Sequence, residues 1–191
     1  CAGLRLQEAT DALNAFGNMY YKQAMASGVI PQITAIFGKC GGDLAVASAM
    51  TDFTFMEGKN GKLFLNSPNA IEGNEVSKCD TASAEFQSEN SGLVDVVGAE
   101  ADILAEIRAL VCMLPANNED DASYDECLDD LNRICEGIEN VAADTALVAT
   151  LISDNNVFFE TKRAYAKDMV TGFVRLNGMT IGVVGNRSKV Y

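Results

Sequence analysis

Apolar residues recur along the chain with two different periods, and this mixture predicts an α/β fold. Spacings of three and four predict helices over residues 6–27, 43–50, 99–114 and 144–152. Short apolar runs rich in β-branched or aromatic residues predict strands over residues 33–37, 53–56, 63–65 and 93–97. Between residues 67 and 90 the pattern is weaker and indicates only short helical pieces.

The C-terminal part of the chain has a different pattern. Residues 169–176 and 179–184 flank Asn177-Gly178, the dipeptide typical of a tight β-hairpin. Before them, Ser123 and Glu126 have the spacing of a capping box, which predicts a helix with one apolar face. That face would comprise Tyr124, Leu128, Leu131 and Cys135.

The charged stretch NNEDDAS at residues 117–123 is typical of a linker between domains. We therefore predict one domain over residues 1–116, an acidic linker and helix over 117–143, and the start of a second domain over 144–191. The chain begins Cys-Ala-Gly-Leu-Arg, without an initiator methionine, so we expect a segment of a longer protein.

Composition excludes two classes of partner. The chain has 191 residues, of which 48% are hydrophobic, and a formal net charge of −13, so we expect a globular acidic protein. Such a charge excludes a nucleic-acid surface, which needs a basic footprint. No apolar run approaches the ~20 residues of a membrane helix, so no membrane insertion is expected.

Six cysteines and no histidine restrict the chemistry further. No cysteine pair is spaced as CxxC, so we predict no metal site. Cys40, Cys79, Cys112 and Cys135 have small or aliphatic neighbours, as reduced and buried thiols do, which indicates a cytoplasmic protein. The missing imidazole excludes Ser-His-Asp and Cys-His catalysis within this chain.

The candidate chemistry lies in the glycine turn at residues 38–42, GKCGG, between a predicted strand and a predicted helix. Backbone N–H groups at a helix N-terminus can bind an anion or a developing oxyanion. From the glycines alone, a tight strand-to-helix connection is the favoured explanation of the turn.

Several blocks of the chain resemble the carboxyltransferase subunits of biotin-dependent acyl-CoA carboxylases and decarboxylases. The blocks are CAGLRLQE at residues 1–8, GVIPQITAIF at 28–37, residues 38–55, and MVTGFVRLNGMTIGVVGNR at 169–187. The family includes propionyl-CoA carboxylase β and glutaconyl-CoA decarboxylase α subunits. The resemblance implies a crotonase-like (ClpP/crotonase) fold that is incomplete here: the latter half of a first domain and the opening strands of a second.

The resemblance also implies a mechanism without a side-chain base. The acyl-CoA substrate forms an enolate held by backbone N–H groups, carboxybiotin supplies the carboxyl group, and biotin takes the substrate proton. One donor of this oxyanion hole would be Gly3, with Leu4 as its neighbour in register. The other would be Gly42, within the turn Gly41-Gly42-Asp43.

Other residues of the matching blocks receive further roles from the resemblance. Ala2, Arg5 and Lys39 are expected to bind substrate, the two basic side chains at the phosphates of coenzyme A. The family usually has glycine or alanine at the position of Asp43, so we expect its carboxylate to face away from the pocket.

The implied partners are acyl-CoA, a biotin carboxyl carrier protein and further copies of the subunit, joined through contacts between the first and second domains. Three alternatives stay open. The parent enzyme could run the transfer in reverse as a decarboxylase, or it could be an enoyl-CoA hydratase- or isomerase-like crotonase enzyme. The hydratase would need a glutamate near the turn, where this chain has small or apolar residues. The segment alone is expected to be inactive, and the third alternative is that it serves only in assembly.

Overall fold

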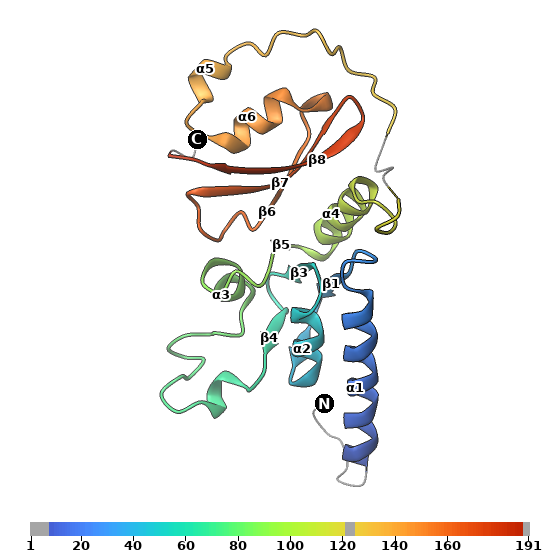
Figure 1. Ribbon diagram of the computed structural model, residues 1–191. Helices are drawn as coiled ribbons and strands as arrows, with labels where there is room; N and C mark the ends of the chain where they lie inside the picture. Colours follow the sequence, from blue (N-terminus) through green and yellow to red (C-terminus); the bar gives the residue numbers. More distant parts are fainter. Residues whose placement is uncertain (1–7, 121–124, 189–191) are drawn as a thin grey trace. The chain divides into compact units, whose positions relative to one another are not determined.

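The computed structural model describes residues 8–120 and 125–188 and divides the chain into two compact units, residues 1–104 and 105–191 (Figure 1). The boundary falls within one helix, α4 (Glu100–Met113). Among the described residues, no helix has both the length and the apolar character needed to span a membrane.

The first unit has parallel strands connected through helices. Its elements are, in order, α1 (Ala9–Ala26), β1 (Ile33–Ile36), β2 (Lys39–Gly41), α2 (Asp43–Ala49), β3 (Phe53–Glu57), β4 (Lys62–Phe64), the 3-10 turn η2 (Pro68–Ala70), α3 (Ala84–Glu89), β5 (Val96–Gly98) and the start of α4. β1, β3 and β5 form one parallel sheet in the order β1-β3-β5, and β2 pairs with β4 in a second.

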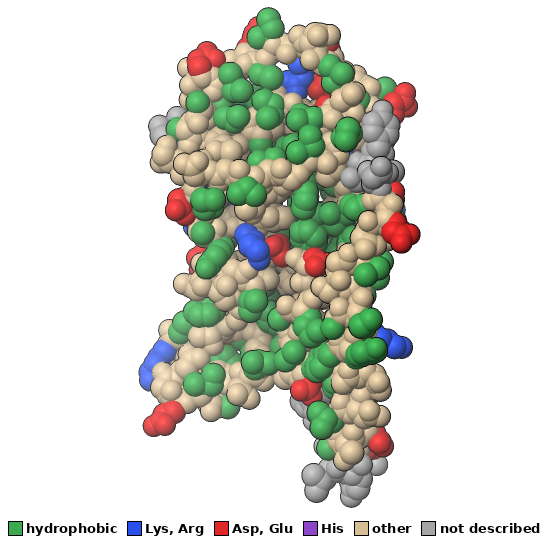
Figure 2. Space-filling view, viewed as in Figure 1, with side chains coloured by type: hydrophobic (Ala, Val, Ile, Leu, Met, Phe, Trp, Pro, Cys, Tyr) green, Lys and Arg blue, Asp and Glu red, His purple; other side chains and the backbone are tan. Residues whose placement is uncertain are grey.

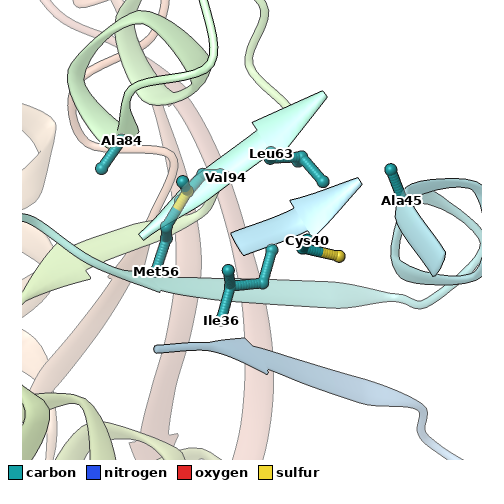
Figure 3. Packing of buried hydrophobic residues seen from close by; sticks show 7 residues of the cluster. All are labelled: Ile36, Cys40, Ala45, Met56, Leu63, Ala84 and Val94. Atoms are coloured by element: carbon teal, nitrogen blue, oxygen red, sulfur yellow. The ribbon is translucent and has the colours of Figure 1, made fainter. Parts of the chain in front are cut away.

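Buried side chains from both sheets meet in one core (Figure 3). Cys40 of β2 and Leu63 of β4 are register partners, and Ala45 brings α2 against them. The other members of the cluster are Ile36, Met56, Ala84 and Val94. This packing fixes the position of α2 relative to β2, the strand that leads into it.

The second unit is an antiparallel sheet with a helix packed on it. It contains α5 (Ile138–Val141), α6 (Thr145–Ile152), the 3-10 turn η3 (Asp154–Asn156), β6 (Phe158–Thr161), β7 (Met169–Leu176) and β8 (Met179–Asn186), with strand order β6-β7-β8. Val170 and Val174 of β7 are buried at alternate positions, as is Phe159 of β6. The sheet therefore buries the face on which these side chains lie.

The predicted hairpin is confirmed, with Leu176 opposite Met179 across the turn. Asn177 and Gly178 both have positive φ angles, 53° and 79°, which is the conformation of a type I′ turn. The buried carboxylate of Asp154 accepts hydrogen bonds from the N–H groups of Asn177 (3.1 Å) and Gly178 (2.7 Å). This contact ties the hairpin turn to η3.

The helix predicted to begin at Ser123 is wrong over the part that the structure describes. Residues 125–136 contain no helix, and Leu128 and Leu131 are exposed; Ser123 and Tyr124 lie outside the described residues. Aspartate side chains here accept hydrogen bonds from nearby backbone N–H groups that a helix would pair with its own carbonyl oxygens. Asp129 Oδ1 accepts from the Asp130 N–H, and Asp130 Oδ1 accepts from the Asn132 N–H. These local bonds favour turns over a helix.

The side chain of Arg133, in the same segment, binds backbone carbonyls at the end of α6. Its Nη atoms donate to Leu151 O (2.8 Å) and Ser153 O (2.6 Å), carbonyls at the end of α6. Its Nε donates to Asp129 Oδ2 at 2.9 Å, and Asn155 N donates to the same oxygen. The Asn155 N–H and then Arg133 lower the pKa of Asp129. The segment thus caps α6 rather than forming a helix of its own.

Three smaller expectations need correction. The predicted glycine turn is partly a strand, since Lys39–Gly41 forms β2. Sequence reasoning did not predict β6 or α5. Of the cysteines expected to be buried, Cys40 is buried and Cys135 half-buried, whereas Cys79 and Cys112 are exposed.

Candidate active site at the start of helix α2

The glycine turn lies where β2 ends and α2 begins. Gly42 caps α2 with φ 62° and ψ −134°, a conformation that L-amino acids with a side chain rarely adopt. Its N–H donates to Phe64 O at 3.0 Å, continuing the pairing of β2 with β4. The N–H of Gly42, one of the predicted oxyanion donors, is therefore already hydrogen-bonded within the sheet.

Asp43 is the first residue of α2 and follows directly on that turn. The N–H groups of the first helical turn have no acceptor within the helix, and the positive end of the helix dipole lies there. Gly41 is the last residue of β2 and the register partner of Phe64. The Asp43 N–H, in the first turn of α2, is placed to donate outside the helix.

Two side chains of α1 hold α2 in place. Tyr20 Oη donates to the carbonyl oxygen of Asp43 at 2.7 Å, and Gln23 Nε2 donates to Ala47 O at 3.1 Å. Partial removal from water, and then the nearby Asp43 carboxylate, raise the pKa of Tyr20, so its phenol stays a donor over the physiological range. Sequence reasoning missed this contact, although Tyr20 and Gln23 have the i, i+3 spacing of one helix face.

A thiol–hydroxyl contact holds α2 from the strand side. Cys40 Sγ lies 3.2 Å from Ser48 Oγ, and Ser48 Oγ donates to Leu44 O at 3.0 Å. Both side chains are buried. This contact and that of Gln23 hold the later turn of α2, whereas Tyr20 holds its first residue.

Two hollows flank α2. One, of about 440 Å³, is lined by α1, β1, the start of β2 and one side of α2, including Lys39, Cys40 and Leu44. The other, of about 570 Å³, is lined by the opposite side of α2, by β4 and the residues after it, and by the α3 region. The exposed Asp43 lines neither hollow. Figure 2 shows hydrophobic side chains reaching the surface over α1 and α2.

The structure places only part of the predicted site. Lys39 is exposed at the rim of the smaller hollow, close in sequence to Asp43. Ala2, Gly3, Leu4 and Arg5 lie outside the described residues. Within residues 8–120 and 125–188, no three cysteine, aspartate or glutamate side chains gather as they would to hold a metal ion.

Curated relatives match almost the whole chain. The alpha subunit of methylmalonyl-CoA decarboxylase from Propionigenium modestum is 34% identical over 199 residues, covering 98% of this chain and 38% of the relative. The carboxyltransferase subunit of propionyl-CoA carboxylase from Haloferax mediterranei is 34% identical, covering 99% of this chain and 39% of the relative. The chain thus spans less than two fifths of the length of these relatives.

Solved structures agree with the sequence comparison. A structure of transcarboxylase 12S, described as a hexamer with hydrolysed methylmalonyl-coenzyme A bound, matches with a TM-score of 0.87 and 31% identity, covering 97% of this chain and 38% of that one. The crotonase-like α/β fold expected from the sequence is confirmed by this match. The Carboxyl transferase domain family matches residues 1–191, and the chain belongs to that family.

Proposed function

We propose that the protein containing this chain transfers a carboxyl group between carboxybiotin and an acyl-CoA. Membership of the Carboxyl transferase domain family is the observation that carries the proposal. The relatives include both a decarboxylase and a carboxylase, so the proposal covers transfer in either direction. It also includes a biotin carboxyl carrier protein as partner, assembly of several subunits and a cytoplasmic location.

The local geometry supports the proposed chemistry. Removing a proton from the α-carbon of an acyl thioester places negative charge on the thioester oxygen, and that charge must be stabilised. We assign this role to the N–H of Asp43, with a second donor at Gly3 or Leu4 as the family resemblance implies. Donors held rigidly before the reaction lower the barrier most, and Tyr20 holds the start of α2 in this way through the carbonyl oxygen of Asp43.

The residues of the site fit an acyl thioester without a metal ion. Backbone donors act on an oxyanion whether or not a side-chain base is present, which agrees with a chain that lacks histidine. Carboxybiotin, brought by the carrier protein, supplies the carboxyl group. Lys39, exposed near the turn, is assigned to a phosphate of coenzyme A.

The test uses the full-length subunit that contains this chain. Incubated with carboxybiotin and propionyl-CoA, it is expected to form a carboxylated acyl-CoA, detected by mass, and avidin is expected to block the reaction by sequestering biotin. A parallel incubation with crotonyl-CoA and no biotin tests the hydratase alternative. Hydration of crotonyl-CoA, with no biotin-dependent transfer, would overturn the proposal.

A further inference from the structure

Asp154 is a buried carboxylate of the second unit that the proposed carboxyl transfer does not use. It is 8% exposed and directly follows Ser153, the fully buried C-cap of α6. Ser153 Oγ donates to Thr150 O at 2.9 Å. On the other side, Asn155 N donates to Asp129 Oδ2 at 3.0 Å. The backbone on both sides of Asp154 is therefore held, and its carboxylate has a fixed position beside the turn between β7 and β8.

Both N–H groups of the Asn177-Gly178 turn donate to Asp154. Its two carboxylate oxygens lie 3.1 Å from Asn177 N and 2.7 Å from Gly178 N. Gly178 is buried, whereas Asn177 is exposed. Hydrogen bonds to an ionised acceptor are stronger than those between neutral groups, so the two peptide groups of the turn are held firmly.

An Asn-Gly dipeptide can react with itself in water. The backbone nitrogen of the glycine loses its proton and attacks Cγ of the asparagine side chain. The new N–C bond closes a cyclic imide, the bond from Cγ to the side-chain nitrogen breaks, and that nitrogen takes up a proton and leaves as ammonia. Water then opens the ring to aspartate or isoaspartate. Glycine favours ring closure because it has no side chain to hinder the approach.

The observed turn opposes both steps of this reaction. The attacking nitrogen must lose its proton, but the Gly178 N–H donates to a buried carboxylate, whose charge would repel a deprotonated nitrogen. Ring closure must also bring Cβ of Asn177 into the plane of the next peptide group, beside its nitrogen. The backbone of a type I′ turn does not place it there. The hydrogen bonds to Asp154 resist rotation out of that turn.

We propose that Asn177 is a site of spontaneous deamidation and that Asp154 suppresses the reaction by binding the Gly178 nitrogen. An isoaspartate at this position would lengthen the backbone by one atom. The turn could then no longer keep the register in which Leu176 lies opposite Met179. Asp154 thus protects the hairpin from chemical change, a role that is independent of carboxyl transfer.

The test follows deamidation of the full-length subunit that contains this chain during long incubation in mildly alkaline buffer. Peptide mapping by mass spectrometry compares the rate at Asn177 with that at Asn60, which begins the other Asn-Gly pair and lies in the first unit. Asp154→Asn is expected to raise the rate at Asn177 by about tenfold or more, the scale of one hydrogen bond to a charged group. The rate at Asn60 should not change. Asp125→Asn is the matched control, because the Asp125 carboxylate binds Arg175 and only its backbone N–H binds the turn.

Loss of stability by itself also speeds deamidation, so Arg187→Met serves as a second variant that loosens the same unit away from the turn. Amide hydrogen exchange in β7 measures the loosening, and urea is added to the more stable variant until the two show equal protection. Asn177 should then still deamidate faster in Asp154→Asn. Equal rates in these two variants, or an unchanged rate in Asp154→Asn, would overturn the proposal.

The unmodified subunit provides a measurement that does not depend on any variant folding. Asn177 is expected to deamidate at least about tenfold more slowly in the folded subunit than in the same chain unfolded in urea. Equal rates in the folded and unfolded chains would show that the turn gives no protection and would also overturn the proposal.

Discussion

Replacing Gly42 by valine is expected to lower kcat for carboxyl transfer by more than about 100-fold, because removing one oxyanion donor typically lowers kcat by about that factor. A β-branched residue cannot adopt φ 62° and ψ −134° without strain of about 1–3 kcal/mol. The turn must change shape, and the Asp43 N–H, one peptide further on, then points away from the thioester oxygen. The measurement is single-turnover transfer to propionyl-CoA in the enzyme assembled from the full-length subunit.

Cys40→Ala is the matched control for Gly42→Val. Cys40 lies two residues before Gly42, and its replacement removes a contact with Ser48, in the later turn of α2, together with one buried sulfur atom of the core, a loss of about 1 kcal/mol in stability. We expect kcat to change less than about fivefold. Greater damage from Cys40→Ala than from Gly42→Val would show that the turn does not act through its backbone.

The second large effect is expected in the second unit, at a buried cluster of charges around Arg187. Arg187 Nη1 lies 3.2 Å from Glu160 Oε1 and 3.6 Å from Asp144 Oδ1, and its Nε donates to Lys167 O at 2.6 Å. The side chains of all three charged residues are at most 7% exposed. Arg187 therefore joins the end of β8 to β6 and to the cap of α6.

Arg187→Met is expected to destabilise this unit by about 3–5 kcal/mol, because removing one partner leaves buried carboxylates without their counter-charge. Arg163→Met is the matched control: Arg163 Nε also lies 3.1 Å from Glu160, but its side chain is 74% exposed. Arg163→Met should lower the free energy of unfolding by no more than about 1 kcal/mol. Amide hydrogen exchange in β7 measures the stability of this unit in both variants. Equal losses of stability in Arg187→Met and Arg163→Met would show that burial of the Arg187 charge cluster does not stabilise the unit.

Local sequence signals predicted the elements whose geometry depends on neighbouring residues. Asn177-Gly178 fixed the hairpin because both positions need positive φ angles. Pro115 and the apolar spacing before it predicted α4 nearly to its observed end at Met113. The helix α2 was predicted in the same way, beginning at Asp43 as observed.

Long-range pairing decided the features that the sequence did not reveal. β2 is only three residues, Lys39–Gly41, and exists because it pairs with β4, more than twenty residues away. That pairing takes up the N–H of Gly42 and moves the candidate donor to Asp43. In residues 125–136, the capping-box spacing predicted a helix, but Arg133 and Asp129 bind residues around the end of α6 instead.

The Asp43 N–H is the donor that we assign to the thioester oxyanion in the described part of the chain. Replacing Asp43 by the corresponding α-hydroxy acid through protein semisynthesis converts that amide to an ester, which removes the N–H and keeps the carboxylate. It also weakens the Gly42 carbonyl oxygen as an acceptor for the N–H groups of Ala45 and Val46. We expect a loss of about 100- to 1000-fold in kcat for carboxyl transfer, with the stability of the enzyme little changed. Transfer at the unmodified rate by the ester-containing enzyme would contradict it.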